Sequence, residues 1–312
     1  MSNIQVADFI RHIHQDHDGH FWMGTNAFGI VYFNGENLAY FSSAEGFGGE
    51  QITGIAEDSN GHLWIATDQG VVKIDKPDES DQEMVFTNYN GTSLFDGHRF
   101  WSIYVDSEDI VWAGSATAVY QFDGEKWTPF EIPYPEAITG DFITAATSMA
   151  ITEDESGHIW FSTMGFGAFK YNGRSFKQYT ESDGLTSNTV DDILVAQNGH
   201  IWFGTRFGGV SRYDGEHFET FSQQNGRIGG NEVCAVFEDS QGNIWFSSEG
   251  YGVYRYDGTS LKNFRREQGL LVGAVQAIAE DSKGRIWVGG GGGLYRLEGE
   301  SFINIIKDGP WD

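Results

Sequence analysis

Cysteine is almost absent from this sequence: Cys234 is the only one among 312 residues. A single cysteine excludes a disulfide framework and a metal site built from several thiolates. Cys234 lies in the apolar run 233–237, so we expect it to be a small core residue. Proline is scarce as well, at 5 residues, and no stretch approaches the ~20 consecutive apolar residues of a membrane span.

Basic residues are also few, with 19 Lys and Arg against 45 Asp and Glu, which gives a net charge of -26. Such a chain has no basic stripe to bind phosphates, so nucleic acid and an anionic membrane surface are not expected partners. The first five residues have neither the basic nor the apolar segment of a secretion signal. Two alternatives stay open: a cytoplasmic protein, or one whose signal has been removed.

Aromatic residues and glycine are abundant, at 15% and 42 residues, and the tryptophans repeat. Each follows an apolar residue, and all but Trp112 follow a glycine turn, with successive spacings of 42, 48, 48, 42, 43 and 42. The repeated positions are Trp22, Trp64, Trp112, Trp160, Trp202, Trp245 and Trp287. A period of this length indicates a repeat architecture.

Each repeat reads as four short strands, A to D, joined by turns. Asn-Gly or Asp-Gly pairs, for example Asn34-Gly35 and Asp257-Gly258, predict type I′ hairpins between strands C and D. Turns such as Asp58 to Gly61 separate strands A and B. We therefore predict an all-β, seven-bladed β-propeller with four antiparallel strands per blade. It spans residues 1–312 as one domain, with blades at about 8–48, 49–96, 97–145, 146–187, 188–230, 231–272 and 273–308.

The repeated string Glu-Asp-Ser-x-Gly-x-Ile-Trp, followed by Gly-Gly-Val-x-Arg-Tyr-Asp-Gly, resembles the two-component regulator propeller repeat. It is most complete at residues 192–215, 238–258 and 280–299. The resemblance implies a ligand-binding, sensor-type propeller of the kind found in periplasmic regions of hybrid histidine kinases, which recognise carbohydrate-derived ligands. It therefore suggests a periplasmic or extracellular location. More distantly, the chain is similar to virginiamycin B lyase-like propellers, which use a metal ion, a His and Glu residues.

Functional residues are expected on one face of the ring. In a propeller the D–A connections and B–C turns meet around the mouth of the central channel, and the A–B and C–D turns lie on the opposite face. At the mouth we single out Glu50, His98, Arg99 and Glu232. Along the inner strands, polar or large side chains replace the small or apolar residues of other repeats: Arg11, Trp101, Asp191, Asp192 and Gln276. Departures from a repeat tend to mark functional positions.

The B–C turns add aromatic residues at matching positions, each followed by glycine: Phe28, Phe166, Phe207 and Tyr251. Polar neighbours in these turns include Asn26, Arg206 and Glu249. Aromatic faces beside amides and charges suit a sugar or another small amphipathic ligand. The same rings could instead pack between blades.

Two D–A connections are longer than the rest, at residues 87–99 and 131–147, and they lie on either side of His98. A long loop at a propeller mouth predicts a wall or lid over the pocket.

Several histidines could suggest a metal site, but their positions in the repeat argue against one. His20, His62, His158 and His200 follow the A–B glycine in four repeats, so they are expected to be structural or surface residues of the far face. His12, His14, His17 and His20 are dense in sequence, but they divide between strand A and its turn.

Three functions stay open from the sequence. The first is recognition of a carbohydrate or other small polar-amphipathic ligand at the channel mouth. The second is a metal-assisted lyase, with His98 as the candidate catalytic base and Mg²⁺ held by Glu50 and Glu232. The third is a platform for a protein partner.

Overall fold

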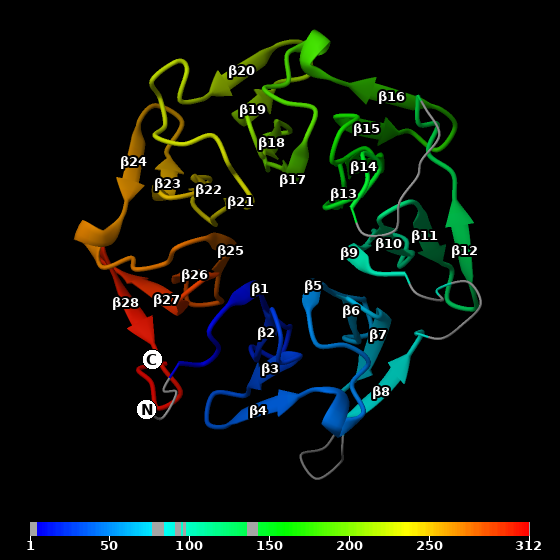
Figure 1. Cartoon of the computed structure of the whole chain (residues 1–312), viewed down its shortest axis with the longest axis vertical. Helices are drawn as coiled ribbons and strands as arrows, with labels where there is room; N and C mark the ends of the chain where they lie inside the picture. Colours follow the sequence, from blue (N-terminus) through cyan, green and yellow to red (C-terminus); the bar gives the residue numbers. More distant parts are fainter. Residues whose placement is uncertain (1–4, 77–83, 91–94, 96–97, 136–142, 312) are drawn as a thin grey trace.

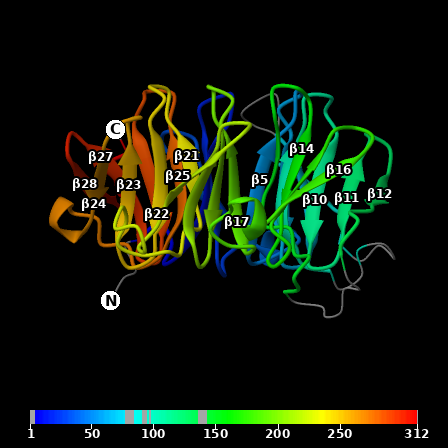
Figure 2. The same cartoon turned by 90° about the horizontal axis from the view of Figure 1, so that it is seen from above.

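The computed structural model describes residues 5–76, 84–90, 95, 98–135 and 143–311. Within these residues the strands form seven four-stranded antiparallel sheets, arranged as a ring about a central axis (Figure 1). Each sheet is one blade, and Figure 2 shows the ring from the side. The predicted seven-bladed propeller is confirmed.

Every blade is built from four consecutive strands, with strand A innermost (Figure 1). Blades 1 to 3 contain β1 (Ile10–Gln15), β2 (Phe21–Thr25), β3 (Ile30–Phe33), β4 (Leu38–Phe41); β5 (Ile52–Glu57), β6 (Leu63–Thr67), β7 (Gly70–Asp75), β8 (Val85–Asn88); and β9 (Phe100–Val105), β10 (Val111–Ser115), β11 (Val119–Phe122), β12 (Trp127–Phe130). Blades 4 and 5 contain β13 (Ile151–Glu153), β14 (Ile159–Ser162), β15 (Ala168–Tyr171), β16 (Phe176–Tyr179); and β17 (Val190–Val195), β18 (Ile201–Thr205), β19 (Gly209–Tyr213), β20 (Phe218–Phe221). Blades 6 and 7 contain β21 (Val236–Glu238), β22 (Ile244–Ser248), β23 (Gly252–Tyr256), β24 (Leu261–Phe264); and β25 (Val275–Glu280), β26 (Ile286–Gly290), β27 (Gly293–Glu298), β28 (Ser301–Ile305). Short 3₁₀ turns cover Ser43–Glu45, Glu181–Asp183 and Arg266–Gln268.

The core lies between blades rather than within them. Each cluster of buried apolar residues joins two neighbouring blades; one of them, for example, packs Trp202 and Phe221 of blade 5 against Phe246 of blade 6. All seven repeated tryptophans are buried. The tryptophan repeat is therefore structural.

Six of these tryptophans make the same hydrogen bond. The indole Nε1 donates to the carboxylate of an aspartate six residues earlier, at 2.7 to 3.1 Å. The pairs are Trp22–Asp16, Trp64–Asp58, Trp112–Asp106, Trp160–Asp154, Trp245–Asp239 and Trp287–Asp281. The same aspartate caps the A–B turn by accepting two backbone N–H groups, as Asp239 does from Gln241 and Asn243. Blade 5 differs because Ala196 stands at the aspartate position.

The C–D turns differ from the predicted two-residue type I′ hairpins. Among the described residues Asp109 is the one non-glycine with positive φ, so Asn34 does not adopt the required conformation. Phe33 instead pairs with Leu38 across a four-residue loop. The Asn34 side chain accepts the backbone N–H groups of Glu36 and Asn37, which satisfies the longer loop.

The two ends of the described chain join blade 7 to blade 1. Gln5 forms a β-bridge with Ile306, and its side chain exchanges hydrogen bonds with Asn304 at 2.9 and 3.2 Å. Trp311 stacks on Phe33 of blade 1, with ring centroids 4.0 Å apart. Ring closure therefore combines backbone pairing with aromatic packing.

Candidate functional site in the central channel

A cavity of about 510 Å³ lies on the propeller axis, where the innermost strands of the blades face one another. All five repeat-breaking inner-strand residues line it. They come from the innermost strands of four blades, namely 1, 3, 5 and 7, and are Arg11, Trp101, Asp191, Asp192 and Gln276. Arg206 also lines the cavity, from the B–C turn of blade 5. The inner-strand residues that break the repeat thus lie around one cavity.

One side of the cavity holds a partly buried ion pair. Arg206 donates from Nε to Asp191 Oδ2 and from Nη2 to Asp191 Oδ1, both at 3.1 Å, so the pair is bidentate. Asp191 is only 6% exposed, and this burial raises its pKa against the opposing effect of Arg206. Burial would lower the pKa of Arg206, but the hydrogen bonds and charge of Asp191 raise it. Each of the two side chains therefore stabilises the charged form of the other.

Cys234 lies beside this pair and lines the cavity, rather than a closed core as expected from the sequence. Its Sγ is 3.7 Å from Asp191 Oδ2. Burial, followed by the charges of Asp191 and Glu232, raises the pKa of the thiol to about 12. The thiolate required of a nucleophile is therefore disfavoured.

Asp192 and His12 are partly buried ionisable groups of the cavity wall. Asp192 Oδ2 accepts the backbone N–H of Val236 at 2.7 Å, which connects blade 5 to blade 6. Its Oδ1 accepts the N–H of Ile193 at 2.9 Å. Burial nonetheless raises the pKa of Asp192 to about 7. Burial and the charge of Arg11 lower the pKa of His12 to about 4, so this imidazole is neutral at pH 7.

On the opposite side of the cavity, Arg11 is joined through two amides to Arg99, which does not itself line the cavity. Asn26 Oδ1 accepts Arg11 Nη1 at 3.1 Å and Gln51 Nε2 at 2.5 Å. Gln51 Oε1 in turn accepts Arg99 Nη1. The guanidinium of Arg99 also lies over the ring of Trp101, 5.3 Å from its centroid. Blades 1, 2 and 3 are thereby linked along the channel wall.

Glu50 and Phe28 lie together at a second, smaller pocket of about 350 Å³ beside blade 1. Phe28 is 56% exposed. Glu50 Oε1 accepts a hydrogen bond from Ser43 Oγ at 2.5 Å. These two predicted residues therefore belong to a different pocket from Trp101 and Asp191.

The other turn aromatics have unequal surroundings. Phe166 is 8% exposed and packs on Tyr134, with ring centroids 5.6 Å apart, so it belongs to the core between blades 3 and 4. Phe207, in contrast, is 67% exposed. Tyr251 is partly buried against the core between blades 5 and 6, and the guanidinium of Arg265 lies 5.5 Å from its ring centroid.

Glu232 and Glu249 come together at the blade 5–6 side of the mouth. Glu249 N–H donates to the backbone oxygen of Glu232 at 2.9 Å. Burial and the charge of Glu232 raise the pKa of Glu249. His98 lies before blade 3, where its ring meets that of Tyr120 edge-on at 6.2 Å. Parts of the two long connections beside His98, including Gly140 and Asp141, lie outside the described residues.

The residues suggested for Mg²⁺ do not form a ligand set in the part of the chain that is described. Glu50 faces the pocket beside blade 1, whereas Glu232 lies near Asp191 on the far side of the axis. The described carboxylate and imidazole atoms close enough for one ion belong to Asp16, Asp18 and His20 instead. We therefore derive no metal-dependent step.

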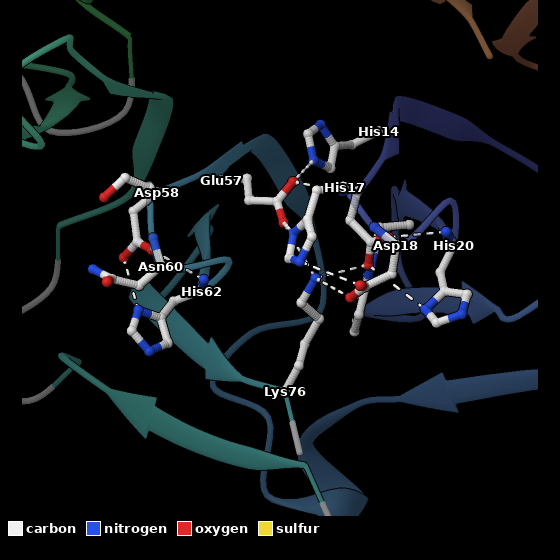
Figure 3. A network of polar contacts seen from close by, with 12 residues as sticks. His14, His17, Asp18, His20, Glu57, Asp58, Asn60, His62 and Lys76 are labelled. Atoms are coloured by element: carbon white, nitrogen blue, oxygen red, sulfur yellow. Dashed lines mark hydrogen bonds and ion pairs between the residues drawn. The ribbon is translucent and has the colours of Figure 1, made fainter. Parts of the chain in front are cut away.

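That acidic group belongs to a polar network between blades 1 and 2, at the A–B turns (Figure 3). Lys76 Nζ lies 3.0 Å from Asp16 Oδ2, 3.2 Å from Asp18 Oδ2 and 3.2 Å from Glu57 Oε1. Glu57 also contacts His17 Nδ1 at 2.6 Å. The lysine ammonium already supplies the positive charge of this cluster, so the network is structural.

Sequence reasoning did not identify the amide link between Arg11 and Arg99, or the part of Cys234 in the cavity wall. Asn26 and Gln51 were visible only as polar residues near the mouth. The signal for Cys234 was weak because its apolar neighbours are typical of any strand.

The sequence model for the two component regulator propeller matches five segments, at residues 5–27, 46–69, 184–207, 227–250 and 269–292. A search of curated proteins gave no match. Within the described residues, no helix is long and apolar enough to cross a membrane.

Among solved structures, the chain is similar to the extracellular domain of BT3049 from B. thetaiotaomicron, described as a hybrid two component system. The TM-score is 0.69 with 20% identity over 95% of this chain, which spans only 46% of that one. PorZ of Porphyromonas gingivalis, a component of the type-IX secretion system, gives a TM-score of 0.70 with 15% identity, covering 94% of this chain and 46% of that one. Virginiamycin B lyase from Staphylococcus aureus gives 0.62 with 16% identity and 82% of both chains. At these identities the similarity concerns the fold alone.

Proposed function

We propose that this two-component regulator propeller is a ligand-binding, sensor-type module that takes a carbohydrate or another small polar-amphipathic ligand in its central channel. One observation carries the proposal: the side chains that break the seven-fold repeat line a single cavity of about 510 Å³ on the axis. Structural side chains would be expected to follow the repeat, as the tryptophans do. Side chains that depart from the repeat and line the same cavity are expected to have a functional role instead.

The cavity has the composition of a small-molecule site. Its volume falls within the usual range for ligand pockets, about 300–1,000 Å³. Trp101 offers an aromatic wall, and the charged and amide groups of Arg11, Gln51 and Gln276 offer hydrogen bonds at its edges. Because Phe207 is exposed in the turn directly after Arg206, its ring is available to a ligand that extends out of the channel.

The likeness to extracellular domains described as hybrid two component systems supports a sensory context. In those proteins this chain matches less than half of the length, so the part that passes on a signal would lie outside the matched region. Binding at the channel needs no catalytic base, so the proposal assigns none to His98.

A thermal-shift screen against neutral and acidic oligosaccharides tests the proposal, with Gln276→Trp as the blocking variant. The added indole would occupy the cavity, and we expect it to abolish the ligand-induced rise in Tm. Gln197→Trp is the matched control, because Gln197 is exposed at the A–B turn of blade 5. Equal ligand shifts in Gln276→Trp and the parent protein would place binding outside the channel and refute the proposal.

A further inference from the structure

The pocket of about 350 Å³ beside blade 1 is separate from the channel, because the two share no lining residue. Its volume lies within the usual range for small-molecule pockets, about 300–1,000 Å³. Three segments contribute the side chains considered below: the B–C turn of blade 1, the connection to blade 2 and the turn after β28, with Phe28, Glu45, Glu50 and Lys307. The first two segments are joined by Gly29 N–H, which donates to the backbone oxygen of Glu50 at 2.8 Å.

The ring of Phe28 is uncovered at this pocket, whereas its counterparts in two other blades are covered. Phe28 is 56% exposed. At the same turn position in blade 4, Phe166 packs on Tyr134. In blade 6 the guanidinium of Arg265 lies 5.5 Å from the ring centroid of Tyr251. A ligand in the pocket would remove the apolar surface of Phe28 from water, which favours binding.

Two carboxylates of the pocket are held in place and remain accessible. Glu50 Oε1 accepts Ser43 Oγ at 2.5 Å, and Glu45 Oε2 accepts the N–H and Oγ of Ser42 at 2.9 and 2.8 Å. Each glutamate thus uses one oxygen for the connection and keeps the other. Among the residues described, no cationic side chain lies within ion-pair distance of either glutamate.

Lys307 brings a positive charge to the same pocket. It is exposed, and its Nζ lies 5.0 Å from the ring centroid of Tyr40. Its turn is fixed by the bridge between Ile306 and Gly309 and by Trp311 Nε1, which donates to Lys307 O at 3.3 Å. In the described part of the chain no carboxylate forms an ion pair with this lysine. The pocket therefore has charges of both signs that do not touch each other.

We propose that this pocket binds a free amino acid with an apolar side chain. Its ammonium group contacts Glu50, its carboxylate contacts Lys307, and its side chain lies against Phe28. An amino acid carries both charges on adjacent atoms of one small molecule, so it complements a pocket whose own charges are apart. A ligand with a single charge would satisfy only one of the two sides. Because the site lies outside the channel, the inference does not depend on the proposed function.

Ligand-observed NMR titrations with three ligands of the same ring test this inference. The probes are L-phenylalanine, phenethylamine, which lacks the carboxylate, and phenylpropanoate, which lacks the ammonium group. We expect phenylalanine to bind at least about 5-fold tighter than either analogue, the size of effect that one partly exposed ion pair supplies.

Three variants separate the contributions. Glu50→Gln should weaken the binding of phenylalanine and phenethylamine and leave phenylpropanoate unchanged. Lys307→Gln should weaken phenylalanine and phenylpropanoate and leave phenethylamine unchanged. Phe28→Ala should weaken all three ligands, and because this ring is exposed its loss should leave the Tm nearly unchanged.

Glu216→Gln and Lys126→Gln are the matched charge controls, because both residues are exposed in C–D turns on the opposite face. They should leave all three affinities unchanged, as should Gln276→Trp, which fills only the channel. Absence of phenylalanine binding, equal affinity for the three ligands, or loss of phenylalanine binding in Gln276→Trp overturns the inference. These outcomes leave the proposed function intact, since that function is tested by saccharide binding in the channel.

Discussion

Replacing Ala196 by aspartate is expected to stabilise the propeller. In blade 5 this alanine stands where six other blades have the aspartate that accepts the tryptophan Nε1. Three polar atoms around it are buried without a hydrogen-bond partner: Trp202 Nε1, His200 Nδ1 and Arg212 Nε. Blade 4 shows what they lack, since Asp154 there contacts Trp160, His158 and Lys170 at equivalent positions. One carboxylate is therefore missing from an otherwise complete arrangement.

The size of the expected stabilisation can be worked out from the three unsatisfied atoms. Leaving a buried donor unsatisfied costs about 1–3 kcal/mol, and a hydrogen bond to a charged group contributes about 1.5–3 kcal/mol. Burying the new carboxylate opposes this gain, but Arg212 and the turn N–H groups would solvate it. We expect a net stabilisation of about 1–3 kcal/mol, which corresponds to a rise in Tm of a few degrees.

Differential scanning calorimetry of Ala196→Asp and of Ala196→Asp/Trp202→Phe measures the effect. Because phenylalanine has no indole N–H, the aspartate should gain less in that background. Asp239→Ala in blade 6 is the reverse control and should lower the Tm. A decrease in Tm for Ala196→Asp, or the same increase with and without Trp202, would show that the three unsatisfied atoms do not explain the site.

Three further outcomes are expected. Because hydrogen bonds from His14, His17 and Lys76 outweigh burial and lower the pKa of Glu57 to about 2, its stabilisation is present above about pH 4.5 and is lost as the pH falls toward 2. Urea unfolding should show Glu57→Gln less stable by about 1–2 kcal/mol at pH 7 and less acid-sensitive; parallel pH profiles would contradict this. The raised pKa of Asp192 predicts the opposite pH dependence of stability. The folded state retains a proton that the unfolded state loses between about pH 4 and 7, so stability falls as the pH rises through this window. Asp192→Asn should remove a fall in stability of up to about 1.4 kcal/mol per pH unit in that window, and an unchanged slope would refute the assignment. Phe166→Ala should destabilise by about 3–5 kcal/mol and Phe207→Ala by less than about 0.5 kcal/mol in the same assay, with equal losses inconsistent with their different burial.

The architecture could be predicted from the sequence because the fold is periodic. Each blade needs a large buried ring at the same place, so the spacing from Trp22 to Trp287 counts the blades. The cavity residues were equally visible, because Arg11, Trp101 and Gln276 contradict a pattern that the other repeats define. Repetition supplies an internal comparison that a single unrepeated domain lacks.

The remaining features depend on neighbours that the pattern does not specify. Phe166 and Phe207 occupy equivalent turns, yet Tyr134 from the preceding blade covers only the first. Arg11 likewise donates to Asn26, which also accepts a hydrogen bond from Gln51 of the neighbouring blade. Such contacts are set by the relative placement of blades, which no local sequence signal describes.

The junction between blades 7 and 1 has a consequence for how the protein is made. Gln5 pairs with Ile306, and Phe33 is covered by Trp311, so these partners of the first blade are synthesised only after blades 2 to 7. Blades 1 to 6 can form in order as the chain leaves the ribosome, each packing on the one before. Blade 1 must meanwhile leave one apolar side in water. That exposed side is where a chaperone, or a second unfinished chain, would bind before the ring closes.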